Sequence, residues 1–164
     1  MPPPPTARLL FRAWTADDFP LAYALWGSAD VTRYIGGPFS AEYVRARLQR
    51  EMDTEAQGGV QYWPIFLRDG GEHAGVCGLR PRNDIYALGF HLHPHFWGQG
   101  LAREAADAVI AYADAIGARE LFAGHHPQNA SSRKLLQRLG FAYTGDELYE
   151  PTGLMHPSYS LRLR

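Results

Sequence analysis

The segment from Leu88 to Glu104 constrains the fold of this chain more than any other. A short apolar run ends before Pro94, a tight passage through Trp97-Gly98-Gln99-Gly100 follows, and a long amphipathic stretch begins at Leu101. This succession predicts a strand, a glycine-containing loop and a helix. Any fold of the chain therefore has to place the end of a strand close to the start of a helix.

A junction of this kind can bind an anion. The first turn of a helix has backbone N–H groups without partners, and the helix dipole adds partial positive charge there. Glycine lets the backbone come close to a bulky group because it has no Cβ. The segment favours a phosphate-binding loop, although an ordinary strand-to-helix turn is an alternative for so short a motif.

Two common nucleotide-binding patterns do not fit this loop. A dinucleotide-binding unit needs Gly-x-Gly-x-x-Gly, but Gly98 and Gly100 are followed by Arg103 where the third glycine is required. The chain also contains no Gly-x-x-x-x-Gly-Lys-Ser/Thr, so a nucleoside-triphosphate loop is not supported.

Composition indicates one globular domain. The 164 residues are 46% hydrophobic and 20% charged, which suits a single domain with a sizeable core. A net charge of −1 does not suggest a nucleic-acid partner. The single cysteine, Cys77, fits a reducing compartment. Without a leader-like or membrane-length apolar run, we expect a cytoplasmic protein with no membrane partner. Residues 1–7 are expected to form a flexible proline-rich arm before a domain at 8–164.

Turn and capping residues divide the domain into short elements. Ser40 and Asn129 are good helix N-caps, and Asp69-Gly70-Gly71 favours a hairpin turn. The order β-α-α-β-β-β-α-β-α-β-β predicts an α+β fold, a mixed sheet with helices on both faces. We expect strands at 8–14, 60–68, 73–80, 85–92, 120–124, 141–149 and 157–163, and helices at 19–26, 41–56, 101–116 and 130–139.

Two motifs carry a resemblance to a known family. Trp97-Gly98-Gln99-Gly100-Leu101-Ala102 resembles the acetyl-coenzyme A (acetyl-CoA) loop of the GNAT acetyltransferase superfamily, Gln/Arg-x-x-Gly-x-Gly/Ala. The tryptophan in the first position resembles the loop of one branch, the ribosomal-protein N-terminal acetyltransferases. Two further segments resemble motifs of the same branch: Asn129-Ala130-Ser131-Ser132 followed by Leu139-Gly140-Phe141, and the N-terminal segment from Arg8 to Arg12. The resemblance spans nearly the whole chain. It implies a mostly antiparallel sheet of six to seven strands, and transfer of acetyl from acetyl-CoA to an amine.

The resemblance also implies roles for individual residues. The backbone of one strand would bind the pantetheine arm, and the N–H groups of the loop would hold the pyrophosphate. Asn129 would contact the donor or act only as an N-cap, and Ser132 is a candidate to protonate the leaving thiolate or simply bonds the backbone. The implied donor-binding residues are Phe90, His91, Leu92, Trp97, Gly98, Gln99, Gly100, Leu101, Ala102, Arg103, Asn129 and Ser132.

The sequence departs from the family at the usual acid and base. Many GNAT enzymes carry a glutamate and a tyrosine where this chain has Gly124 and Leu136. Three nearby histidines, His91, His125 and His126, are candidates for a general base or a water relay, because imidazole titrates near neutral pH. The alternative is that they are ordinary loop or surface histidines.

A metal site is not expected. His91, His93 and His95 alternate as ligands on one strand face would, but no cysteine or acidic residue has a convincing ligand spacing.

The acceptor end of the site is less determined. The family would place it around the loop between the first two helices and the final strand pair. Several aromatic and acidic residues are available there, namely Trp26, Tyr34, Tyr62, Trp63 and Tyr149, with Asp30, Glu147 and Glu150. A protein N-terminal amine and a small-molecule amine both remain open, as do a monomer and a homodimer. The alternatives to an enzyme are a non-catalytic CoA-binding module and, less favoured, a dinucleotide-binding protein.

Overall fold

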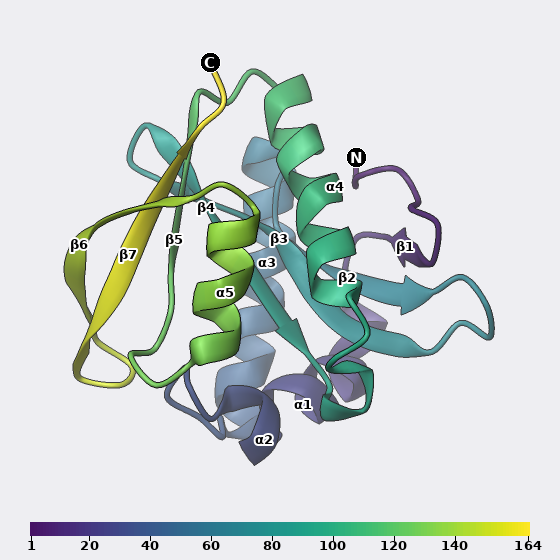
Figure 1. The fold of residues 1–164 in the computed structure, drawn as a ribbon. Coiled ribbons are helices and arrows are strands. Elements are labelled where there is room, and N and C mark those ends of the chain that lie inside the picture. Colours follow the sequence, from purple (N-terminus) through teal and green to yellow (C-terminus); the bar gives the residue numbers. More distant parts are fainter.

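The computed structural model describes all 164 residues and is built around a seven-stranded sheet (Figure 1). The strand order is β1-β2-β3-β4-β5-β7-β6, and only the β4–β5 pair is parallel. The expected α+β fold with a mostly antiparallel sheet is therefore confirmed. The strands are β1 (Leu9–Phe11), β2 (Tyr62–Leu67), β3 (His73–Arg82), β4 (Ile85–Leu92), β5 (Glu120–Gly124), β6 (Ala142–Tyr149) and β7 (Leu154–Arg162).

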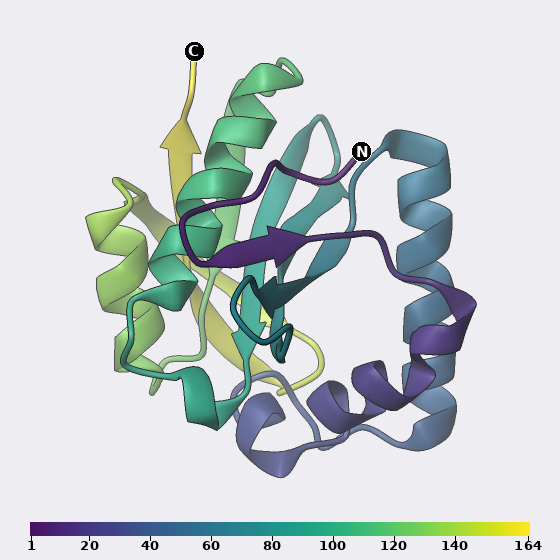
Figure 2. The same ribbon diagram turned by 90° about the vertical axis from the view of Figure 1, so that its right-hand side faces the viewer.

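Helices cover both faces of the sheet (Figure 2). One face carries α1 (Phe19–Trp26), α2 (Ala29–Thr32) and α3 (Ala41–Gly58). The other face carries α4 (Leu101–Ala115) and α5 (Ala130–Arg138), and short 3-10 turns lie at η1 (Ala16–Asp18) and η2 (Pro94–Phe96). None of these helices combines the length and the hydrophobicity that a membrane crossing requires.

The predicted apolar stripes form the two halves of the core. On α4, Leu101, Ala105, Val109 and Ala113 are buried against the sheet, as their spacing predicts. The alanines among them let α4 lie close to β3 and β4. On the opposite face, Val44 and Leu48 of α3 pack with Trp14, Ala22, Leu25, Trp26, Tyr62 and Val76.

The sheet opens between its two parallel strands. β4 and β5 pair only at Tyr86 with Leu121 and at Ala87 with Phe122. Both strands continue beyond this point, β4 to Leu92 and β5 to Gly124, without pairing to each other. The backbone edges of the two strands therefore face a gap in the middle of the sheet.

The element boundaries agree with the sequence in some places and differ in others. α1, β4 and β5 have the predicted bounds. The region 27–38, expected to be a loop, contains α2, because Ser28 caps a short helical turn by accepting a hydrogen bond from Val31 N. β7 begins at Leu154 instead of 157. Pro157 is accommodated within this strand opposite Asp146, and its carbonyl accepts a hydrogen bond from His125 N.

Candidate active site

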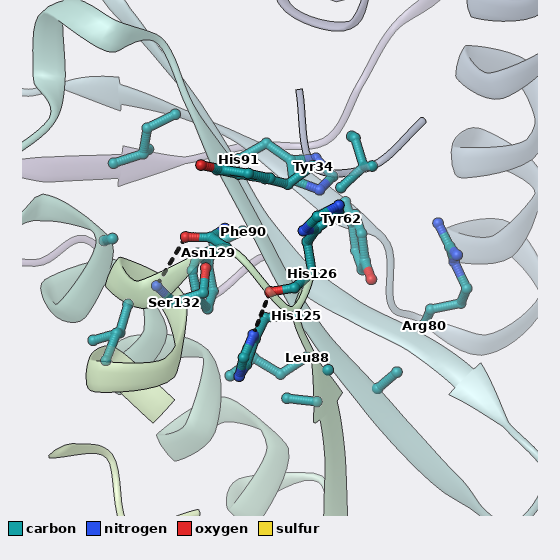
Figure 3. Close-up of a pocket in the computed structure, with 18 of the residues that line it drawn as sticks. Tyr34, Tyr62, Arg80, Leu88, Phe90, His91, His125, His126, Asn129 and Ser132 are labelled. Atoms are coloured by element: carbon teal, nitrogen blue, oxygen red, sulfur yellow. Dashed lines mark hydrogen bonds between the residues drawn. The ribbon is translucent and has the colours of Figure 1, made fainter. Parts of the chain in front are cut away.

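A cavity of about 1640 Å³ follows the gap between β4 and β5. Its wall includes residues from the Trp97–Arg103 loop, the start of α5, the ends of β4 and β5, α2, α3 and the β6–β7 turn. In the view of Figure 3, Phe90 and Ser132 lie toward one end of the cavity and Arg80 toward the other. The cavity thus joins the two motifs that the sequence separates by more than one element.

The loop between η2 and α4 presents a run of free backbone donors. The N–H groups from Gly98 to Arg103 donate no hydrogen bond within the protein, and no side chain caps α4. Gly98 and Gly100 have left-handed φ values of 73° and 76°, which glycine adopts without the strain a side chain would add. A Cβ at Gly98 would meet nothing within 4 Å, so the space beside the loop is open at this position. This geometry fits a diphosphate.

An ion pair braces this loop from behind. The Glu104 carboxylate accepts hydrogen bonds from Thr6 Oγ1, from Arg8 N at 2.8 Å and from Arg8 Nε at 2.7 Å. Arg8 Nη1 also donates to the Gln99 carbonyl at 2.9 Å. Burial raises the pKa of Glu104, but the hydrogen bonds from Thr6 and Arg8 outweigh burial and hold that pKa below its ordinary value. Thr6 belongs to the segment predicted to be flexible, and here it contacts the domain.

Two side chains of the loop bond back to the preceding segment. Trp97 Nε1 donates to the Leu92 carbonyl at 2.9 Å, and Gln99 Nε2 donates to the His95 carbonyl at 2.9 Å. Trp97 itself is 53% exposed. Its hydrogen bond fixes the loop to the end of β4, which gives a structural reason for the tryptophan of the motif.

The cavity wall beside the loop carries positive charge. Arg103, Lys134 and Arg138 line the cavity on the side of α4 and α5. Arg103 has only a long contact to Asp107, 3.8 Å between Nε and Oδ2. These cations suit the phosphate groups of a nucleotide.

The start of α5 brings the second motif to the cavity. Asn129 caps the helix, its Oδ1 accepting from Ser132 N at 3.1 Å, so the predicted capping role is confirmed (Figure 3). The Asn129 amide N–H groups and the Ser132 hydroxyl have no hydrogen-bond partner in the protein, and both residues line the cavity. These groups are therefore available to a bound molecule.

His91 lies on the opposite side of the gap, where its ring is held in one tautomer. Trp26 Nε1 donates to His91 Nδ1 at 3.2 Å, which places the proton of the neutral ring on Nε2. Burial, reinforced by the charges of Arg47 and Arg80, lowers the pKa of His91 to about 3. Near neutral pH the ring is a hydrogen-bond donor toward the cavity.

His125 and His126 are also engaged. His125 is buried; its Nδ1 donates to the His126 carbonyl at 2.7 Å, and its Nε2 accepts from the Tyr159 hydroxyl at 3.1 Å. His126 Nδ1 accepts from Gln128 N at 3.0 Å, so its neutral ring carries the proton on Nε2. These bonds fix the orientation of both rings, and the role of a histidine base stays a prediction.

The end of the cavity where the acceptor is expected also contains charged residues that sequence reasoning missed. Arg47 and Glu51 of α3 form a buried pair, 2.6 Å between Nε and Oε2, and Glu51 Oε1 also accepts from Tyr62 N. Arg80 lies against the Tyr62 ring, with Cζ 4.8 Å from the ring centroid. The helical period was the available signal, because Arg47 and Glu51 fall on the same stripe as the predicted core residues Val44 and Leu48.

The predicted acceptor-side residues divide into two groups. Tyr34, Tyr62, Tyr149, Asp30 and Glu147 line the cavity. The remaining three do not. Trp63 is in the core, where its Nε1 donates to Glu55, Trp26 lies buried behind His91, and Glu150 lies in the β6–β7 turn.

His156 completes this region and was not predicted. Its ring is stacked on Tyr149 at 4.5 Å and lies 5.4 Å from the ring of His126. Burial, followed by the neighbouring His126 and His125, lowers the pKa of His156.

No group of three or more His, Cys, Asp or Glu side chains is arranged to hold a metal ion.

Comparisons with known proteins agree with this geometry. Residues 8–142 match the sequence model of a family described as an acetyltransferase (GNAT) domain. The uncharacterized N-acetyltransferase p20 of Bacillus licheniformis is 28% identical over 146 residues, 85% of this chain and 82% of that protein. An acetyltransferase structure from Agrobacterium tumefaciens str. C58 superposes with a TM-score of 0.86 at 23% identity, over 99% of this chain and 95% of that chain. RimL, a ribosomal L7/L12 α-N-protein acetyltransferase solved with coenzyme A, superposes with a TM-score of 0.83 at 20% identity, over 99% and 98%.

The family match covers most of the domain, including the loop from Trp97 to Arg103 and the start of α5. The fold comparisons extend over nearly the entire chain. The resemblance inferred from the two motifs is therefore confirmed, and this chain belongs to the GNAT family of acetyltransferases, which transfer acetyl from acetyl-CoA.

Proposed function

We propose that the chain transfers acetyl directly from acetyl-CoA to a primary amine within the gap between β4 and β5. The observation that carries this proposal is the run of free backbone donors from Gly98 to Arg103. This run lies beside the end of β4, which pairs with β3 but no longer with β5. A diphosphate on these donors would let the pantetheine arm enter the gap. RimL, solved with coenzyme A on the same fold, gives a precedent for a ligand of this class.

The donor-binding roles follow from the groups that the protein leaves unpaired. The N–H groups from Gly98 to Arg103 would hold the pyrophosphate. The backbone of Phe90, His91 and Leu92 borders the gap and would pair with the amide groups of pantetheine, as an added strand does at a sheet edge. The free amide of Asn129 would bind the same arm from the other side.

The transfer step needs a group that stabilises the oxyanion of the tetrahedral intermediate and a group that protonates the leaving sulfur. Acetyl-CoA supplies an activated thioester, from which the amine nitrogen takes the acetyl group as the C–S bond breaks. A backbone N–H at the end of β4, near Leu92, would stabilise the oxyanion. The Ser132 hydroxyl, which has no protein partner, would donate a proton to the leaving sulfur and recover one from water. Because a thiol has a pKa of roughly 8.5, this donor assists the step without being essential.

The proton lost by the amine goes to water in this proposal. His91 presents an N–H to the cavity, and both ring nitrogens of His125 are already bonded. We assign to His91 the orientation of a water molecule that accepts the proton, which is the relay form of the histidine hypothesis.

A covalent acetyl-enzyme is disfavoured by the only cysteine. Cys77 is buried in the sheet, does not line the cavity, and burial raises the pKa of its thiol far above the ordinary value. Direct transfer is the remaining route that needs no nucleophile on the protein.

The experiment that tests this function has two stages. Calorimetric titration with acetyl-CoA and, separately, with NAD comes first, followed by a free-thiol release assay over a panel of amines. We expect acetyl-CoA to bind and thiol release to depend on the amine. Preference for NAD would favour a dinucleotide-binding protein, and acetyl-CoA binding without release from any peptide or small amine would favour the non-catalytic module.

A further inference from the structure

The acceptor side of the cavity has more cations than anions. Apart from the Trp97–Arg103 loop and α5, the charged side chains on the cavity wall are five arginines and three carboxylates. Arg82 is neutralised by Glu147, 2.6 Å between Nη2 and Oε1, and Arg47 by Glu51. The wall is formed by Arg33, Arg47, Arg50, Arg80 and Arg82, with Asp30, Glu51 and Glu147.

Arg80 is the cation best placed to meet an acceptor. Its nearest carboxylate is Glu51 at 3.9 Å, and that carboxylate already bonds Arg47 and Tyr62 N. The guanidinium is held over the Tyr62 ring and its side chain is 45% exposed. The tip of the Tyr62 ring lies against Gly89 of β4, where an added Cβ would be 2.4 Å from the hydroxyl. The Tyr62 ring therefore contacts both the Arg80 guanidinium and the backbone of β4, the strand that borders the gap.

Arg47 and Arg80 both affect the charge that this part of the cavity can accept. Arg47 Nη2 is buried and has no hydrogen-bond partner in the protein. Arg47 and Arg80 both disfavour a positive charge on His91, which lines the same cavity. An acceptor with only an ammonium group would meet the same repulsion, whereas an acceptor that also carries an anion would be stabilised.

The acceptor side is closed above by contact between two loops. An added Cβ on Gly36, after α2, would lie 2.5 Å from the Pro151 carbonyl oxygen in the β6–β7 turn. Tyr34 reaches the ring of His126, 5.0 Å between centroids. This contact leaves less room for a long polypeptide than an open groove would, and it favours a compact acceptor.

The geometry points to a small amine with a carboxylate a few bonds from its nitrogen, of the size of a free amino acid, as the acceptor, with Arg80 binding the carboxylate. The inference rests on the proposed acetyl transfer and names the class of its second substrate. The guanidinium fork matches a carboxylate through paired hydrogen bonds. The aromatic rings of Tyr34, Tyr62 and Tyr149 would surround the rest of the molecule.

A matched ligand series tests this inference without depending on turnover. Binding of N-acetylphenylalanine, N-acetylphenylalaninamide and N-phenethylacetamide would be measured by calorimetry on protein saturated with coenzyme A. The carboxamide stands for the peptide bond of a protein N-terminus, so it separates a free amino acid from a polypeptide. We expect the carboxylate to bind at least tenfold more tightly than the carboxamide. Initial rates with phenylalanine, phenylalaninamide and phenethylamine should follow the same order.

Two variants assign the effect to one side chain. Arg80→Gln should remove the preference for the carboxylate while leaving the carboxamide affinity within twofold. Arg45→Gln is the matched control, because Arg45 is exposed on α3 over the Phe19 ring and does not line the cavity. A carboxylate preference below tenfold, no binding of the carboxylate, or a preference that survives Arg80→Gln overturns the inference. Acetyl-CoA titration of the same samples distinguishes failure of this inference from failure of the proposed function. If the wild type does not bind acetyl-CoA, the proposed function is refuted, and the inference falls with it.

Discussion

The proposed donor side of the cavity is formed by backbone groups, whereas the proposed acceptor side is formed by side chains. The donor side uses backbone N–H groups from one continuous segment, Gly98 to Arg103, held in place by glycine conformations and by the Arg8–Glu104 pair. The acceptor side uses side chains from α2, α3, β2, β3 and the final strand pair. A site made of backbone tolerates changes of side chain, whereas a site made of side chains can change its ligand without changing the fold.

Gly100→Trp gives the largest expected effect and tests the backbone character of the donor side. The side chain would impose strain at φ 76°, and since a Cβ there would lie 3.5 Å from Arg8 Nη2, it would also displace the Arg8 side chain that holds the loop in place. We expect acetyl-CoA binding to be abolished in calorimetry. Gly117→Trp is the control, since Gly117 has φ 88°, an open surround and a position beyond the far end of α4. If both variants bind acetyl-CoA equally, the donor side is not the site described.

Glu51→Ala tests how far the acceptor side depends on one buried pair. The change would leave the Arg47 guanidinium buried without its carboxylate and Tyr62 N without an acceptor. Loss of one partner of a buried pair costs about 3 to 5 kcal/mol, which should appear in urea unfolding. Acetyl-CoA affinity should stay within threefold. Asp53→Ala is the control, because Asp53 is exposed on α3 and bonds only Gln49 one turn away. For this variant we expect the free energy of unfolding to fall by less than about 1 kcal/mol.

Ser132→Ala tests the proposed proton donor, which lies where the donor side of the cavity meets the acceptor side. We expect kcat to fall roughly tenfold, less than usual for a general acid because a thiol leaves readily. The acetyl-CoA dissociation constant should stay within twofold, because backbone groups carry most of that binding. Ser132→Thr keeps the hydroxyl and should recover most of the rate. An unchanged kcat in the alanine variant would remove Ser132 from the chemistry.

The last prediction concerns His91 and the pH dependence of stability, an effect that is spread over several pH units. The pKa of His91 is about 3 in the folded protein, against an ordinary value of 6.5. Below pH 6.5 the unfolded chain binds a proton there that the folded protein does not, so stability is full above 6.5 and falls as pH drops toward 3. The slope contributed by this ring is at most about 1.4 kcal/mol per pH unit.

His91→Asn keeps an acceptor for Trp26 and cannot titrate, so unfolding between pH 7 and 4 should show a shallower slope than in the wild type. His73, whose pKa burial lowers to about 4, remains in both proteins and accounts for residual slope. Parallel slopes would show that His91 titrates normally. The same variant should keep most of its turnover if the ring only orients water, whereas a loss above 100-fold would restore it as a base.

The donor side could be predicted from the sequence because its information is local. Glycine positions, the start of α4 and the cap at Asn129 are contiguous in the chain, and the capping bond from Ser132 N is found. The acceptor side could be predicted only in part. Five of the eight residues expected there line the cavity, but the contact of Arg80 with Tyr62 depends on the pairing of β2 with β3, and Glu51 reaches them from α3. The histidine tautomers likewise depend on distant partners, such as Trp26 for His91 and Tyr159 for His125.

The parting of β4 and β5 has a kinetic consequence. The gap connects the two faces of the sheet. The proposed donor side lies on the face covered by α4 and α5, and the proposed acceptor side lies on the face covered by α1 to α3. Under direct transfer both substrates must be present together, and neither occupies the other's route into the gap. The reaction should therefore proceed through a ternary complex that forms in either order, with double-reciprocal plots that intersect and with no exchange of label between acetyl-CoA and coenzyme A in the absence of amine.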